Sequence, residues 1–131
     1  MSDNLAQQTC IPCSGTLPPA TADEIAKHHA QLPHWQVIAP DGISQIQRQY
    51  GFSNFLQALA FTNRVAELAE SAGHHPALLT EWGKVTVTWW THAIAGLHKN
   101  DFVMAAKTDE VAVRCHANIG AAPTTSVEAH A

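Results

Sequence analysis

Residues 53–73, SNFLQALAFTNRVAELAESAG, carry the clearest helical pattern in this chain of 131 residues. One set of side chains recurs every three or four residues, the spacing of a single helix face: Phe55, Leu59, Thr62, Ala66 and Ala69. A second set runs beside it: Phe61, Val65 and Leu68. We expect Ser53 to cap a helix over 54–72 and Gly73 to end it in the left-handed conformation. This apolar surface is wider than one sheet face needs, so part of it is expected to meet another subunit.

Strand pairs flank the helix on both sides. Upstream, residues 35–50 read WQVIAPDGISQIQRQY and predict two strands around a turn at 40–42. The second of these strands places four side chains on one face: Ile46, Arg48, Tyr50 and Phe52. Downstream, residues 77–92 read ALLTEWGKVTVTWWTH and predict another hairpin, with Gly83 near its turn.

Two further helices complete the pattern. Thr21 and Glu24 match a capping box that begins a short helix to about Gln31, and a third helix is expected from about Lys99 to Val113. The order helix, hairpin, helix, hairpin, helix predicts an α+β domain over residues 21–117, in which three helices pack on one face of a four-stranded antiparallel sheet. Residues 1–20 are expected to form a flexible N-terminal arm, and residues 118–131 a disordered tail.

The composition limits the classes of function. A net charge of −4 with scattered basic residues argues against nucleic-acid binding. No apolar run approaches the roughly 20 residues that span a bilayer, and the N-terminus does not resemble a signal peptide, so a cytoplasmic location is expected. The three cysteines, Cys10, Cys13 and Cys115, do not suggest a disulfide framework. With His116 they could supply four zinc ligands, although reduced and unpaired thiols are favoured.

Two adjacent histidines follow the long helix on a turn that Pro76 stiffens. Neighbouring residues in extended backbone point in different directions, so His74 and His75 are not expected to share one metal ion. Either imidazole can exchange a proton near neutral pH, although a pair of solvated turn histidines remains the alternative. His92 ends the hairpin that begins after this turn, and the hairpin can bring it back towards the pair.

Two carboxylates accompany these histidines. Glu70 lies four residues before His74, near a helix end where a negative charge opposes the helix dipole. This position suggests a role besides helix stability, although a solvated surface residue is an equal alternative. Asp101 falls in the first turn of the third helix, where the dipole favours it for structural reasons alone.

The joint spacing is more specific than any single residue. Glu70 is followed after three residues by HHP at 74–76, after five more by Trp82, after nine by His92 and after eight by Asp101. This pattern resembles the signature of the pterin-4a-carbinolamine dehydratase family, and the resemblance extends from about residue 21 to residue 113. The segment PHW at 33–35 also looks like that family. His98 and Trp82 depart from it, since many members have Ser or Thr at the first of these positions and others have Tyr or Phe at the second.

The resemblance implies an enzyme that removes water from 4a-hydroxytetrahydropterin to give the quinonoid dihydropterin, without a metal or an organic cofactor. Such a reaction regenerates the pterin of aromatic amino-acid hydroxylases, which implies a functional link to phenylalanine hydroxylase. By position, the family's three active-site histidines match His74, His75 and His92. Its pterin-site tryptophan and aspartate match Trp35 and Asp101, and Glu70 matches an acidic signature position.

Our hypothesis for the chemistry gives the proton transfers to His74 and His92, while His75 orients the pterin. Glu70 and Asp101 would hold imidazole tautomers or bind polar ring edges, and Trp35 would pack near the ring.

Other functions remain open at this point. Some relatives bridge the dimerisation helix of a transcription factor, so a helix-binding or dimerisation module is one alternative. The wide apolar helix face is explained more simply by self-association into a dimer or tetramer. A zinc-dependent hydrolase built on the histidines is a further alternative, which the divergent directions of His74 and His75 disfavour.

Overall fold

A computed structural model describes residues 5–8 and 18–115. The four strands are β1 (Gln36–Ile38), β2 (Gln45–Gly51), β3 (Ala77–Glu81) and β4 (Lys84–Trp89). The three α-helices are α1 (Ala22–His29), α2 (Phe55–Ala72) and α3 (Lys99–Arg114). Three short 3-10 helices are η1 (Leu5–Gln7), η2 (Pro40–Gly42) and η3 (His92–Ile94). Three helices and an antiparallel four-stranded sheet confirm the predicted α+β class.

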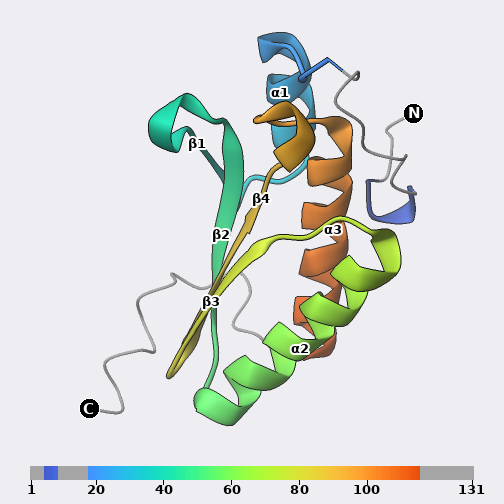
Figure 1. Cartoon of the computed structure of the whole chain (residues 1–131). Coiled ribbons are helices and arrows are strands. Elements are labelled where there is room, and N and C mark those ends of the chain that lie inside the picture. The colour runs from blue at the N-terminus through green and yellow to red at the C-terminus, as the bar shows by residue number, and fades with distance from the viewer. Residues whose placement is uncertain (1–4, 9–17, 116–131) are drawn as a thin grey trace.

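The sheet has the strand order β1-β2-β4-β3, so β2 and β4 form its centre. Their antiparallel register places Ile46 opposite Trp89 and Tyr50 opposite Val85. All four of these side chains are buried on the face that the helices cover (Figure 1). The predicted inner face of β2 is therefore confirmed, and it includes the charged side chain of Arg48, which is also buried.

α2 and α3 lie against the inner face of the sheet, and α1 packs on the first half of α3 (Figure 1). The ring centroids of His28 on α1 and Phe102 on α3 are 5.2 Å apart. The predicted capping box begins α1, because the Thr21 backbone N–H donates to Glu24 Oε1 at 2.8 Å and the Glu24 N–H donates to Thr21 Oγ1 at 3.2 Å. The Thr21 N–H lowers the pKa of Glu24 by stabilising its carboxylate.

Only one of the two predicted ends of α2 is confirmed. Gly73 ends the helix with φ 66°, as predicted. At the other end, the prediction of Ser53 as the cap is wrong: the cap is Asn54, whose Oδ1 accepts from the Gln57 N–H at 2.9 Å. Both residue types are good caps, so the choice depends on where the helix enters from β2.

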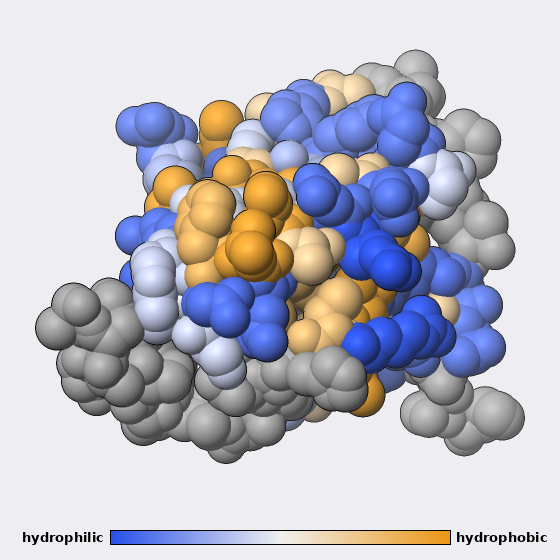
Figure 2. Space-filling view, turned by 90° about the horizontal axis from the view of Figure 1, so that it is seen from below, coloured by the Kyte–Doolittle hydropathy of each residue, from blue (hydrophilic) through white to orange (hydrophobic). Residues whose placement is uncertain are grey.

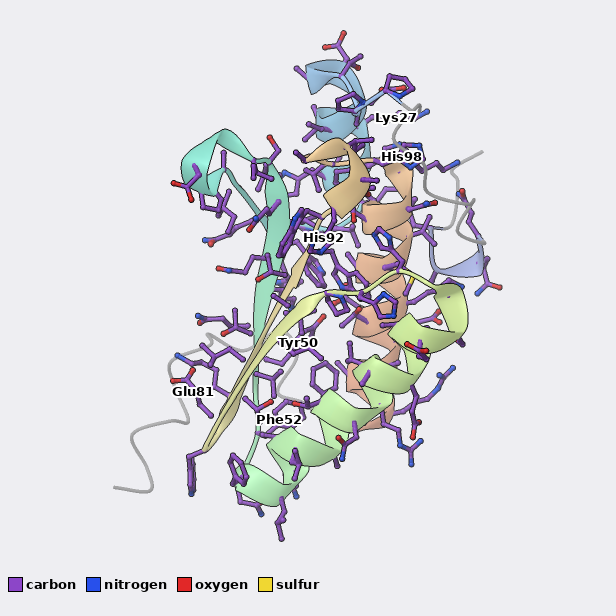
Figure 3. All side chains as sticks on the ribbon, viewed as in Figure 1. Lys27, Tyr50, Phe52, Glu81, His92 and His98 are labelled. Atoms are coloured by element: carbon purple, nitrogen blue, oxygen red, sulfur yellow. The ribbon has the colours of Figure 1, made fainter. Side chains whose placement is uncertain are left out.

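The buried face of α2 is centred on the second predicted set of side chains. Phe61 lies with its ring centroid 4.8 Å from that of Tyr50 and 5.1 Å from that of Phe52. Figure 3 shows Tyr50 and Phe52 between the sheet and α2. Phe55 and Leu59, from the first set, are exposed instead. The expectation that the helix carries more apolar surface than the sheet uses is thus confirmed for its first turns.

The start of the chain contacts α3. Leu5 in η1 is buried, and Lys107 Nζ donates to the carbonyl oxygen of Ala6 at 2.9 Å. The flexible arm predicted for residues 1–20 and the disordered tail predicted for 118–131 stay predictions, because most of the arm and all of the tail, with Cys10, Cys13 and His116, lie outside the described residues. No helix in the described ranges is both long and apolar enough to cross a bilayer.

Candidate active site

A buried imidazole–carboxylate pair forms the deepest part of the candidate site. The left-handed turn at Gly73 takes the chain out of α2, and the His74 N–H then donates back to the carbonyl oxygen of Ala69 at 3.1 Å. This turn points the His74 side chain inwards, where it is 5% exposed. His74 Nε2 lies 2.6 Å from Oδ1 of Asp101, which is fully buried on the first turn of α3.

The second carboxylate oxygen of Asp101 is also bound. Oδ2 accepts from the Thr91 hydroxyl at 2.8 Å and from the backbone N–H of His98 at 2.9 Å. The second of these bonds is half of a capping box at the start of α3, where His98 is the N-cap. Three hydrogen-bonding groups therefore surround a carboxylate that is shielded from solvent, and this is the condition under which a buried charge is tolerated.

An indole ring lies parallel to the His74 imidazole. The rings of Trp89 and His74 stack with centroids 5.7 Å apart and an interplanar angle of 3°. Trp89 is itself anchored, because its indole N–H donates to Thr108 Oγ1 at 3.1 Å. Sequence reasoning did not identify Trp89 or Thr91 as site residues; the available signal was their position within three residues of His92, where β4 ends.

The other two predicted histidines lie at the surface. The His75 side chain is 61% exposed, and its Nε2 lies 2.9 Å from Oε1 of Glu70, which is also exposed. His92 is exposed in η3, with its ring centroid 4.4 Å from that of Trp90. In Figure 3 it lies where the chain leaves β4. His92 follows directly after Thr91, whose hydroxyl contacts Asp101, so the backbone links it to the buried pair.

Four of the six predicted site residues thus form two pairs, His74–Asp101 and His75–Glu70. His92 adjoins the first pair only through the backbone of Thr91, and Trp35 lies apart from both pairs. The expectation that Trp35 packs near the substrate ring stays a prediction; in the structure Trp35 is 1% exposed. Its indole N–H donates to both oxygens of Asp109 at 3.1 and 3.2 Å. Asp109 lies eight residues after Asp101 on α3, roughly 12 Å along the helix axis. The ring of Trp35 therefore packs in the core instead of facing the histidines.

Asp109 organises a second polar cluster that sequence reasoning missed. Its Oδ1 accepts from Arg48 Nη1 at 2.9 Å and from the Tyr50 hydroxyl. Burial, reinforced by the negative charge of Asp109, raises the pKa of Tyr50 well above its ordinary value. The available signal was Arg48, a charged residue on an otherwise apolar strand face, which requires a buried partner.

The zinc alternative requires several ligand side chains close together, and the part of the chain that the structure describes does not contain such a group. Within residues 5–8 and 18–115, no three His, Cys, Asp or Glu side chains are placed to hold one metal ion. The site instead offers imidazoles in two environments, one buried on a carboxylate and two exposed. Such groups are suited to donating and accepting protons near neutral pH.

Comparison with known proteins identifies similar chains. The family described as "Pterin 4 alpha carbinolamine dehydratase" matches residues 18–111. A Marinobacter nauticus protein named for pterin-4-alpha-carbinolamine dehydratase is 58% identical over 108 residues, covering 82% of this chain and 97% of its own. A Syntrophotalea carbinolica protein named for the same enzyme is 56% identical over 107 residues, covering 82% and 96%.

Solved structures resemble the fold as well. A Brucella melitensis protein described as a transcriptional coactivator/pterin dehydratase aligns with a TM-score of 0.67 and 32% identity, covering 72% of this chain and 99% of that one. A pterin dehydratase-like protein described as a RuBisCO assembly factor in the alpha-carboxysome aligns with a TM-score of 0.51, over 60% of this chain and 88% of that one. At 22% identity, the second likeness concerns the fold alone.

Proposed function

Because the chain belongs to the pterin-4-alpha-carbinolamine dehydratase family, we propose that it removes water from a 4a-hydroxytetrahydropterin and releases the quinonoid dihydropterin. The observation that carries this proposal is the His74–Asp101 pair, whose Nε2 and Oδ1 atoms lie 2.6 Å apart at the family's signature positions. His75, the next residue of the same turn, forms a second and exposed pair with Glu70.

The reaction requires two proton movements. The hydroxyl group on C4a accepts a proton and departs as water, while N5 of the pterin loses its proton and forms a double bond to C4a. The lone pair of N5 assists the departure, so moderate acids and bases suffice. Imidazoles, with an ordinary pKa of about 6.5, can act in both directions at neutral pH.

The histidines receive separate roles in this proposal. His74 and His92 transfer the protons, and His75 orients the pterin by hydrogen bonding. The Asp101 carboxylate favours the His74 tautomer that carries its proton on Nε2, which leaves Nδ1 as the acceptor nitrogen of the ring. Glu70 acts on His75 in the same way. In this proposal Trp35 supports the core through its bond to Asp109.

The test follows quinonoid absorbance by stopped flow after 4a-hydroxytetrahydropterin is generated in the presence of the protein. Wild-type protein is expected to accelerate dehydration, and the double variant His74→Gln/His92→Gln to lose roughly a hundred- to ten-thousand-fold in rate. His34→Gln, an exposed histidine outside the site, is the matched control. No acceleration by the wild type would refute the activity, whereas full activity in the folded double variant would refute the assignment of the histidines.

We further propose that the product returns to an aromatic amino-acid hydroxylase such as phenylalanine hydroxylase. A coupled assay tests this link: at limiting pterin and with a reductase present, the protein is expected to raise steady-state tyrosine formation. An unchanged rate of tyrosine formation would contradict the link to the hydroxylase, while the dehydration activity could still hold. The cytoplasmic location stays a prediction.

A second candidate function is protein binding through the start of α2. Leu56 is 75% exposed, with Phe55 and Leu59 exposed beside it, and Figure 2 shows an apolar patch over this end of the molecule. We propose that this surface joins copies of the chain into a dimer or tetramer. A role in binding a helix of another protein is the alternative; the Brucella melitensis relative is described as a transcriptional coactivator as well as a pterin dehydratase.

A further inference from the structure

The orientation of His74 depends on Asp101, and the orientation of Asp101 depends on the segment between β4 and α3. We propose that Thr91 is a positioning residue, which holds the Asp101 carboxylate and thereby sets the ring orientation and tautomer of His74. The consequence for turnover rests on the proposed dehydration, whereas the consequence for the His74 ring does not.

Thr91 is held rigidly enough to act in this way. It is buried, and its backbone pairs with Gly96, since the Thr91 N–H donates to the Gly96 carbonyl oxygen at 2.9 Å and the Gly96 N–H donates back at 3.4 Å. Ala95, with φ 51°, makes the reversal that closes this small loop. The loop therefore fixes the backbone of Thr91 by its own hydrogen bonds, and this places the hydroxyl beside Asp101.

The hydroxyl acts on the oxygen of Asp101 that His74 does not use. Oδ2 accepts from Thr91 at 2.8 Å and from the His98 N–H at 2.9 Å, and together these two donors define the carboxylate plane. Carboxylate torsions are otherwise broad, because an sp³–sp² bond has shallow minima. With Oδ2 held, Oδ1 lies 2.6 Å from His74 Nε2 and favours the proton on that nitrogen.

Trp89 restricts how the imidazole can respond when this support is lost. Its indole lies parallel to the His74 ring with the centroids 5.7 Å apart, and this limits how far the ring can tilt towards that side. Rotation of the Asp101 carboxylate would therefore weaken the bond to Nε2 and allow the second tautomer. Thr91 and Trp89 restrain two different motions of the same ring.

The experiment compares Thr91→Val, which keeps the shape and removes the hydroxyl, with Thr91→Ser, which keeps the hydroxyl. Thr88→Val is the matched control, because Thr88 is a buried β4 threonine whose hydroxyl accepts from Gln47 Nε2 instead of contacting the site. Imidazole ¹⁵N spectra of histidine-labelled protein report the tautomer of His74, with its signals assigned through His74→Gln. Stopped-flow dehydration of 4a-hydroxytetrahydropterin reports kcat and KM separately.

We expect Thr91→Val to give mixed His74 tautomer signals and to lower kcat roughly tenfold with little change in KM, the size of effect expected for one hydrogen bond to a charged group. Thr91→Ser and Thr88→Val should resemble the wild type in both measurements. Wild-type ¹⁵N signals in folded Thr91→Val would overturn the positioning role. Loss of dehydration in every protein, including the wild type, would instead refute the proposed function and leave the spectra informative.

Should Thr91→Val fail to fold, the wild-type protein supplies the second measurement. The Thr91 hydroxyl proton and the His74 ring proton are expected to exchange slowly with solvent, and Asp101→Asn is expected to accelerate both. A Thr91 hydroxyl proton in fast exchange in the wild type would overturn the positioning role.

Discussion

The indole of Trp89 and the imidazole of His74 lie parallel, with ring centroids 5.7 Å apart and planes that differ by 3°. They come from different parts of the fold, since Trp89 ends β4 and His74 follows the C-terminus of α2. The sheet core thus supports a site residue directly. Changes to this part of the core should therefore alter the chemistry as well as the stability.

Replacing Trp89 separates these two effects. Trp89→Leu removes the stack and part of a buried side chain, so we expect a loss of about 3 kcal/mol in the free energy of unfolding and a lower dehydration rate. Trp89→Phe keeps an aromatic ring and removes the bond to Thr108, at a cost of about 1 kcal/mol. Urea unfolding and stopped-flow assays measure both. A folded Trp89→Leu protein with wild-type kcat would contradict a role for the stack.

The Asp109 cluster should matter for stability alone. Asp109→Ala leaves the buried guanidinium of Arg48 without its carboxylate and removes the acceptor of Trp35 and Tyr50. We expect the free energy of unfolding to fall by about 3 kcal/mol, the lower end of the cost of breaking a buried pair. At temperatures where the variant is folded, its dehydration rate should stay near the wild-type value. A large loss of kcat in the folded variant would indicate that Trp35 does serve the site.

Tyr50 should make the stability of the protein depend on pH in the alkaline range. Burial raises the pKa of Tyr50 in the folded state above the value of about 10 that it has when unfolded. The phenol thus stays protonated longer in the folded protein, and its contribution to stability is complete below pH 10 and decreases as the pH rises. Above this point the free energy of unfolding should fall by up to about 1.4 kcal/mol for each pH unit.

Tyr50→Phe is the control for this dependence. The variant loses the hydrogen bond to Asp109 at neutral pH and should be less stable than the wild type there. It has no phenol to ionise, so the difference between the two proteins should shrink as the pH rises from about 9 to 11. Urea unfolding at several pH values measures the difference. A difference in the free energy of unfolding that stays constant from about pH 9 to 11 would show that Tyr50 does not titrate as described.

Local signals explain what could be predicted from the sequence. The period of α2, the turn at Gly73 and the capping box at Thr21 each depend on residues within a few positions of one another, and all three are present in the structure. Ser53 and Asn54 show the limit of this reasoning, because two good capping residues stand side by side and only the path from β2 selects one.

The contacts within the site depend on long-range packing. His74 and Asp101 are separated by 27 residues, and their bond requires α3 to lie against the sheet in one particular register. The pattern of spacings indicated both residues, and the hypothesis that Asp101 holds an imidazole left open which histidine it would contact. Trp35 was assigned by its position in the family pattern, but the packing of its ring against Tyr50, with centroids 6.2 Å apart, takes it into the core.

His98 is a titratable residue used as a helix cap, and its replacement tests the start of α3. His98 Nδ1 accepts from the Asn100 N–H at 3.2 Å, while the His98 backbone N–H donates to Asp101. His98→Ala removes the first bond and should cost about 1 kcal/mol in the free energy of unfolding. His98→Ser supplies a hydroxyl cap and should recover most of this loss. Thermal unfolding of the three proteins is the measurement, and equal stability of the Ala and wild-type proteins would rule out a capping role for the ring.

The exposed start of α2 leads to a prediction about assembly. Leu56→Glu places a charge in the centre of the apolar surface formed with Phe55 and Leu59, and burial of an unpaired charge in an interface is costly. The wild type is expected to elute as a dimer or tetramer in size-exclusion chromatography with light scattering, and the variant as a smaller species. Gln49→Glu, which adds the same charge on an exposed side chain of β2, should keep the wild-type mass.

The activity of the Leu56 variant separates assembly from chemistry. Leu56 lies 16 residues before the end of α2 at Ala72, roughly 24 Å along the helix axis, so the substitution does not reach the His74 turn. If one chain contains the whole site, a smaller species should keep the wild-type kcat. A monomeric wild type would contradict self-association and favour a different partner for this surface. Loss of kcat together with mass would instead mean that a neighbouring copy completes the site.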